Sequence, residues 1–276
     1  MNYQDIICYD FETTSVNPHR CQPTQLGAVA IHGRKLEIHS GSEFCSYIKP
    51  VFDLDECERL GLDPVTEEVL TKTHIKMEDL ETAPSPKEVW GQFQQYVNKY
   101  NSRKGKWGAP VKAGMNIHHY DNIIIDRLAG GHIRNARKEL DNLLSGGIIE
   151  TEVGKALKKL KVGVEPGKLK LSDLLAREMR KLEPYGFGPW DDERQEETLF
   201  YPSGDLDLRD ILWMWFENNT DVTGLGLDAM REYFSLETEG SHMADKDAND
   251  VALLLIKFLK LHRNFGPKVK FKGSCK

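Results

Sequence analysis

The stretch Ile6-Ile-Cys-Tyr-Asp10-Phe-Glu12 decides the fold, because a short apolar run ends in two acidic residues. Ile6–Tyr9 is apolar throughout and predicts a buried strand. Side chains alternate along a strand, so Asp10 and Glu12 project from the same face and can share one cation. Two neighbouring carboxylates repel each other unless a metal ion or a proton lies between them. Asp191-Asp-Glu193 repeats this spacing, but it lies in a Pro- and Gly-bearing loop with no strand to orient it.

Outward from this strand, the chain alternates strands with helices. Ser85-Pro-Lys-Glu88 predicts a helix start, since serine can cap, proline suits the first helical position and glutamate follows three residues after the cap. Periodicity and Gly or Pro breaks predict further ordered segments: strands at Gln25–Ile31, Phe44–Ile48 and Val111–Met115, a helix at Asp121–Leu128, ordered segments at Leu206–Phe216 and Leu225–Phe234, and a long helix from about Asp245 to Phe265. This alternation predicts an α/β fold with a mixed sheet flanked by helices.

The pattern changes between residues 131 and 204. Helical pieces such as Arg134–Leu144 and Leu171–Leu182 alternate there with loops that carry Gly and Pro. We interpret this segment as a mainly helical insertion or lid within a single domain that spans residues 1–276.

Three further candidate residues follow ordered segments. Asp121 opens a helix directly after a predicted buried strand, where a structural carboxylate at the helix N-terminus is an equally good explanation. His242 and Asp247 stand five residues apart at the start of the last helix, whose apolar face can hold Asp247 rigid. His74 and Asp79 have the same spacing without such a helix after them. Spacing alone therefore leaves a surface role open for His242.

Composition narrows the class of protein. No apolar run approaches the roughly 20 residues that span a bilayer, so we expect no membrane partner. The net charge of -6 argues against a protein that coats nucleic acid nonspecifically, but an active site that holds cations must itself be acidic. The five scattered cysteines include no C-x-x-C pair and predict neither a disulfide framework nor a zinc site. Reduced thiols and a start without a signal sequence favour the cytosol.

The order of these motifs resembles that of the DEDDh, or DnaQ-like, superfamily of 3′→5′ exonucleases with a ribonuclease H-like fold. A strand-borne Asp-x-Glu, a mid-chain Asp and a late His-x-x-x-x-Asp make up the common pattern. Three segments are most similar to the catalytic domain of bacterial exonuclease I: Asp10-Phe-Glu-Thr13, Pro23-Thr-Gln-Leu-Gly-Ala28 and Gly114-x-Asn116-x-x-x-Tyr120-Asp121. The resemblance covers about residues 5–130 and 205–262 and leaves residues 131–204 without a counterpart.

The resemblance implies a two-metal site. Asp10, Glu12 and Asp247 would bind one Mg²⁺ or Mn²⁺, Asp10 would also reach a second ion, and Asp121 would hold that second ion. Hard oxygen ligands suit these cations. Two such ions can stabilise the attacking and leaving oxygens of an in-line displacement. His242 would take a proton from the attacking water, and the expected product is a nucleoside 5′-monophosphate.

The resemblance also implies a nucleic-acid partner, with single-stranded DNA expected and RNA possible. Backbone at Thr13 and Thr14 would meet the terminal 3′-OH, and Asn116 is a further candidate for substrate contact. Single strands are held by aromatic stacking and a basic groove, for which the insertion offers Tyr185, Phe187 and Trp190, with core packing as the alternative. The alternatives are an exoribonuclease with the same chemistry, a noncatalytic nucleic-acid-binding module and a proofreading subunit. The sequence names no protein partner.

Overall fold

The computed structural model describes residues 3–103, 105, 107–129, 199–238 and 241–265. The chain divides into two compact units, residues 1–124 with 196–276 and residues 125–195. The first unit holds every strand of the described part of the chain. Most of the predicted insertion, with Tyr185, Phe187 and Trp190, lies outside the described residues, so its role as a lid stays a prediction.

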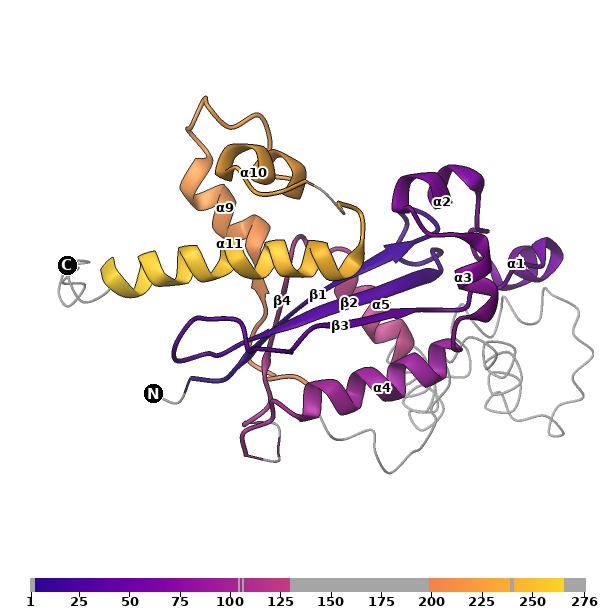
Figure 1. Cartoon of the computed structure of the whole chain (residues 1–276), viewed down its shortest axis with the longest axis horizontal. Coiled ribbons are helices and arrows are strands. Elements are labelled where there is room, and N and C mark those ends of the chain that lie inside the picture. Colours follow the sequence, from indigo (N-terminus) through magenta and orange to yellow (C-terminus); the bar gives the residue numbers. More distant parts are fainter. Residues whose placement is uncertain (1–2, 104, 106, 130–198, 239–240, 266–276) are drawn as a thin grey trace, which may run out of the picture. The chain divides into compact units, whose positions relative to one another are not determined.

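A mixed five-stranded sheet forms the centre of the first unit, as predicted (Figure 1). The spatial order is β3-β2-β1-β4-β5, where the strands are β1 (Ile6–Thr13), β2 (Pro23–Ile31), β3 (Phe44–Tyr47), β4 (Val111–Gly114) and β5 (Leu206–Asp207). β1 pairs antiparallel with β2 and parallel with β4. β2 also pairs antiparallel with β3, and β5 pairs parallel with β4. β1 is therefore the central strand, with a neighbour on each side along its apolar half.

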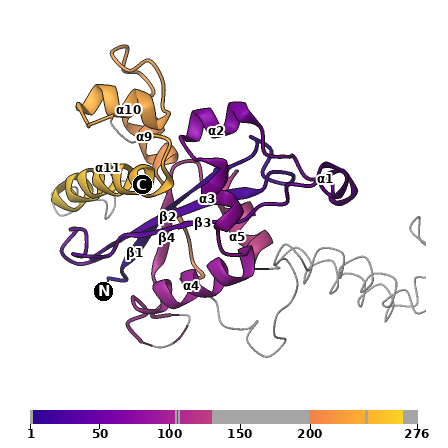
Figure 2. The ribbon, with the colours of Figure 1, turned by 45° about the vertical axis from the view of Figure 1, so that its right-hand side comes forward.

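Helices cover both faces of this sheet. In order along the chain, the helices of the described residues are α1 (Leu54–Leu60), α2 (Glu67–Thr73), α3 (Met77–Thr82), α4 (Pro86–Asn98), α5 (Asp121–Leu128), α9 (Leu208–Phe216), α10 (Leu227–Phe234) and α11 (Ala244–Phe265). α11 and α4 lie on opposite faces in both views (Figures 1 and 2). None of the helices in the described part of the chain is long and apolar enough to cross a bilayer.

The alternation of side chains along β1 divides the strand between two cores. Cys8 packs in the cluster that contains Val251 and Leu255 of α11. On the other face, the Tyr9 ring lies 6.1 Å from the Phe93 ring of α4 and 5.9 Å from the Phe200 ring, measured between centroids. The next two residues on the α11 face are Asp10 and Glu12, since side chains two apart on a strand share a face. The strand therefore presents both carboxylates toward α11.

The start of α4 follows the predicted capping box. The Ser85 hydroxyl accepts the backbone N–H of Glu88, and the Glu88 carboxylate accepts the backbone N–H of Ser85 at 2.8 Å. The buried face of α4 carries Val89, Trp90 and Phe93, which recur at helical spacing. The four cysteines in the described residues, Cys8, Cys21, Cys45 and Cys57, are free thiols.

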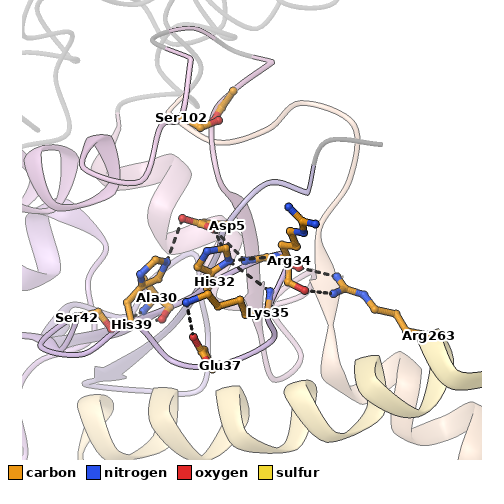
Figure 3. Close-up of polar contacts among 12 residues, drawn as sticks. Asp5, Ala30, His32, Arg34, Lys35, Glu37, His39, Ser42, Ser102 and Arg263 are labelled. Carbon is orange, nitrogen blue, oxygen red and sulfur yellow. Dashed lines mark hydrogen bonds and ion pairs between the residues drawn. The ribbon is translucent and has the colours of Figure 1, made fainter.

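A polar cluster ties the N-terminal end of β1 to the turn after β2 and to the end of α11 (Figure 3). Asp5 accepts the backbone N–H of Gly33 at 2.9 Å and lies 3.1 Å from Nε2 of His39. The Arg263 guanidinium of α11 donates to the carbonyl oxygens of Gly33 and Arg34 at 2.7 and 2.9 Å. The C-terminal end of the long helix is thus fixed to the turn that follows β2.

Candidate active site

Three of the predicted carboxylates converge at the end of β1. Asp10 and Glu12 come from this strand, and Asp247 comes from the first turn of α11. Each offers an oxygen, and these oxygens lie within 4.8 Å of one another. The sequence separates Glu12 from Asp247 by more than two hundred residues, so the packing of α11 on the sheet creates this cluster.

The N-terminus of α11 is seated directly on β2. The side-chain oxygen of Gln25, which is fully buried, accepts the backbone N–H of Ala244 at 2.9 Å. Gly27 lies opposite Asp10 in the sheet, and a Cβ atom there would stand 2.1 Å from the carbonyl carbon of Ala244. Only glycine permits the helix to approach this closely. Both residues belong to the motif Pro23-Thr-Gln-Leu-Gly-Ala28, but no local pattern in the sequence indicates that they hold the start of this helix.

Asp121 joins the same end of the sheet from the start of α5. Its buried carboxylate accepts the backbone N–H of Phe11 and its own backbone N–H, while its Oδ1 atom has no hydrogen-bond partner within the described residues. Burial raises the pKa of Asp121 to about 7, against the opposing effect of these two hydrogen bonds. A buried oxygen without a partner is costly unless a ligand satisfies it. Asp121 therefore has an unused acceptor beside β1.

The electrostatics of the cluster favour a bound cation. Burial raises the pKa of Asp10 well above its usual range, and repulsion from Asp121, Asp247 and Glu12 raises it further. Burial, with repulsion from Asp247, raises the pKa of Glu12 to about 8, although the Lys72 ammonium lowers it. Several carboxylates that cannot ionise together without compensation form a donor set of hard oxygens, which suits a divalent cation such as Mg²⁺.

His242 lies two residues before α11 and contacts Asp247. Its backbone N–H donates to the Asp247 carboxylate, and its backbone has a positive φ of 65°. A left-handed backbone is uncommon for a residue other than glycine and persists where surrounding structure holds it. The His242 side chain is only partly buried. The structure thus brings the predicted base next to a predicted ligand.

The predicted substrate contacts have structural partners of their own. The Thr13 hydroxyl lies 2.5 Å from the Tyr120 hydroxyl, and the buried Thr14 hydroxyl donates to the carbonyl oxygen of Asp63 at 2.8 Å. The Asn116 side chain accepts from Arg209 at 2.9 Å. Contact of these residues with a substrate stays a prediction. Thr14 has no accessible hydroxyl to offer, so only its backbone could serve.

A second acidic group with a histidine, formed by His118, Asp207 and Asp210, has a different character. Asp207 caps α9, and its carboxylate accepts the backbone N–H groups of Asn116 at 2.8 Å and Arg209 at 3.0 Å. His118 and Asp210 are exposed. Both oxygens of Asp207 already accept backbone N–H groups. Asp207 is therefore explained as a helix cap that links β5 to the loop before α5.

The fold is similar to that of known exonucleases. Residues 7–105 match the model of an exonuclease family, RNase_T. No curated protein sequence matches the chain. Among solved structures, Escherichia coli exonuclease I in complex with a dT13 oligonucleotide has a TM-score of 0.54 at 12% identity, over 96% of this chain and 43% of that chain.

Two further solved structures have similar scores. A 3′-exonuclease that recognises the 3′ end of the histone mRNA stem-loop has a TM-score of 0.52 at 12% identity, over 94% of this chain and 83% of that chain. The nuclease domain of 3′hExo, a DEDDh family member bound to rAMP, has a TM-score of 0.52 at 13% identity, over 94% of this chain and 92% of that chain. These likenesses establish a common fold, and the chain spans less than half of exonuclease I.

Proposed function

We propose that the chain is an exonuclease of the DEDDh superfamily that removes nucleotides one at a time from the 3′ end of single-stranded DNA. One observation carries the proposal: the oxygens of Asp10, Glu12 and Asp247 lie within 4.8 Å of one another at the end of the central strand. Carboxylates that repel one another in a buried position need a compensating cation. The products would be nucleoside 5′-monophosphates.

Asp10, Glu12 and Asp247 would hold one Mg²⁺, and Asp121 would hold a second that Asp10 also reaches. When bound, the ions supply charge stabilisation for the oxygens that enter and leave the phosphorus atom. The unpartnered Oδ1 of Asp121 and the elevated pKa values of the cluster support this donor set. Mn²⁺ should substitute, because it also accepts carboxylate oxygens in six-coordinate sites.

His242 would accept the proton of the attacking water. Histidine is the side chain that most often serves as a general base in catalysis. His242 is partly buried and its backbone N–H donates to the Asp247 carboxylate, which supports this role. Thr13, Thr14 and Asn116 are proposed to position the terminal nucleotide, the two threonines through their backbone.

An exoribonuclease with the same chemistry is the second candidate. The observation that favours it is the extent of the match to 3′hExo, since this chain spans 92% of that rAMP-bound nuclease domain but only 43% of exonuclease I. The observation that favours DNA is the slightly higher TM-score with exonuclease I, 0.54 against 0.52. Both candidates share the same carboxylates, so only a substrate comparison separates them.

The test is digestion of 5′-end-labelled DNA and RNA oligomers of identical sequence, single-stranded and duplex, with Mg²⁺ and with excess chelator. We expect a ladder of products shortened from the 3′ end, faster on single-stranded DNA, and no digestion with chelator or with a 3′-terminal phosphate. Asp10→Asn protein, purified in parallel, controls for a contaminating nuclease. Faster digestion of RNA would establish the second candidate, and full activity in chelator would exclude the metal site.

A further inference from the structure

A buried arginine lies directly behind the carboxylate cluster. Arg231, on α10, has only 1% of its surface exposed. Its Nη2 donates to Oδ1 of Asp247 at 2.5 Å, its Nε to Asp250 at 2.8 Å and its Nη1 to Asp228 at 2.9 Å. Each guanidinium nitrogen therefore has its own carboxylate, and the planar group is fixed in one orientation.

Asp250 is the most deeply buried carboxylate that accepts from Arg231. It is fully buried on α11, one helical turn after Asp247, and its second oxygen accepts the Lys246 ammonium at 2.5 Å. α10 contacts α11, and the guanidinium of Arg231 bridges the two helices. Asp228, by contrast, is largely exposed, and its pair with Arg231 contributes little in water.

A role in stability alone explains this network poorly. Burial removes the charges from water at a cost in free energy, and buried ion pairs are often no more stabilising than apolar side chains of the same volume. The contact of Arg231 with Asp247 instead points to a role in fixing the orientation of this carboxylate. Oxygens of Asp247, Asp10 and Glu12 lie within 4.8 Å of one another, and carboxylates this close repel one another when no cation lies between them. A fixed guanidinium on Oδ1 holds the Asp247 side chain against this repulsion.

We propose that Arg231 is a positioning residue for the metal site, acting through Asp247. It holds this carboxylate so that one oxygen stays with those of Asp10 and Glu12 before any cation binds. The inference rests on the proposed function for the identity of the ligands. It assigns to Arg231 a contribution to cation affinity that is separate from its contribution to folding.

The experiment measures Mn²⁺ binding directly, by titration followed through the electron paramagnetic resonance of the free ion, beside thermal melts without metal. Arg231→Met strands the buried Asp250 charge, so the decisive variant is Arg231→Met combined with Asp250→Asn. Arg231→Lys keeps the positive charge but lacks the planar set of guanidinium donors. The matched control is Arg263→Met, which removes an arginine that fixes the opposite end of α11 to the turn that follows β2 (Figure 3).

Loss of a residue that orients a ligand typically lowers metal affinity by about 10- to 100-fold. We expect this loss in the double variant, an intermediate loss in Arg231→Lys, and a lower melting temperature with wild-type Mn²⁺ affinity in Arg263→Met. Equal Mn²⁺ affinity in the wild type and the double variant would overturn the inference. So would an equal loss of affinity in Arg263→Met, which would show a general effect of helix stability.

The outcome is distinguishable from failure of the proposed function. A wild-type protein that binds Mn²⁺ but digests neither DNA nor RNA would contradict the proposed function, while the loss of affinity in the double variant would still support the role of Arg231. A wild-type protein that binds no Mn²⁺ would overturn both the metal part of the proposed function and this inference.

Discussion

Replacing Gly27 by alanine tests whether the seat of α11 on the sheet sets the geometry of the carboxylates. The added Cβ would stand 2.1 Å from both the carbonyl carbon of Ala244 and the backbone nitrogen of Asp245, whereas ordinary contact begins at 3.4 Å. Both neighbours are backbone atoms, so no side-chain rotation relieves the overlap. The N-terminus of α11 must therefore retreat by about 1 Å, and Asp247 moves with it.

The expected losses of stability and of reaction rate follow from this overlap. Overpacking a core typically costs about 1–3 kcal/mol, and a clash between backbone atoms belongs at the upper end. For a unit of this size, about 3 kcal/mol lowers the melting temperature by roughly 6–12 °C. A misplacement of about 1 Å at a reacting centre can lower the rate by about 10²-fold. We expect both effects in Gly27→Ala protein, with weaker Mn²⁺ binding.

The assay combines a thermal melt with the rate of 3′-end digestion at saturating metal and at limiting metal. Gly91→Ala is the matched control, because Gly91 lies within α4 and a Cβ there would meet no atom within 4 Å. Alanine is favoured over glycine in a helix by about 0.5–1 kcal/mol, so this variant should melt slightly higher and keep its rate. A Gly27→Ala protein with a wild-type melting temperature and rate would refute the reasoning.

Three further predictions concern the site itself. Asp10→Asn should nearly abolish digestion and Mn²⁺ binding while the circular dichroism spectrum stays unchanged, since it removes a ligand charge without changing volume. His242→Ala should lower the single-turnover rate by about 10²–10⁴-fold with normal Mn²⁺ affinity; an unchanged rate across pH 6–9 would exclude the role of a base. The folded-state pKa of Glu12 is about 8 against an ordinary 4.5, so the folded metal-free protein binds more protons than the unfolded chain, and its stability should fall as pH rises from 4.5 to 8. Mn²⁺ should therefore raise the melting temperature more at pH 8 than at pH 5, and Glu12→Gln should flatten the metal-free profile.

The parts of the fold with strong local signals were predictable from the sequence. β1 follows from an apolar run, α4 from its capping box and α11 from a long apolar face, because each signal lies within the element it specifies. The short helices α1, α2 and α3 were not predicted. Each has six or seven residues, too few for periodicity to separate a helix from a loop, and they are stable only through their packing.

The site was predictable as a set of residues but not as a geometry. Motif order identified Asp10, Glu12, Asp121 and Asp247, and the structure brings these carboxylates to one end of the sheet. The register that places Gly27 opposite Asp10 depends on strand pairing, which no local pattern specifies. Glycine in a strand does indicate a close backbone approach, but the sequence does not say which element approaches.

Arg231 was missed, although one signal for it was present. Asp250 falls on the apolar stripe of α11, between the positions of Asp247 and Leu254, where a charge must be paired once it is buried. That position requires a cation from another element. The sequence offers many lysines and arginines, and only the packing of α10 against α11 selects Arg231.

The carboxylates of this site differ in how firmly the fold holds them. Asp10 and Glu12 share a central strand, so their separation is set by the strand itself and survives small shifts elsewhere. Asp247 belongs to a helix, and its distance from them depends on Gln25 and Gly27 beneath the helix and on Arg231 beside it. Substitutions in the helix seat should therefore weaken cation binding through Asp247 while the strand-borne pair keeps its place. The geometry of the site therefore depends most on the packing of α11. The residues that hold this helix in place matter to the chemistry as much as the proposed ligands do.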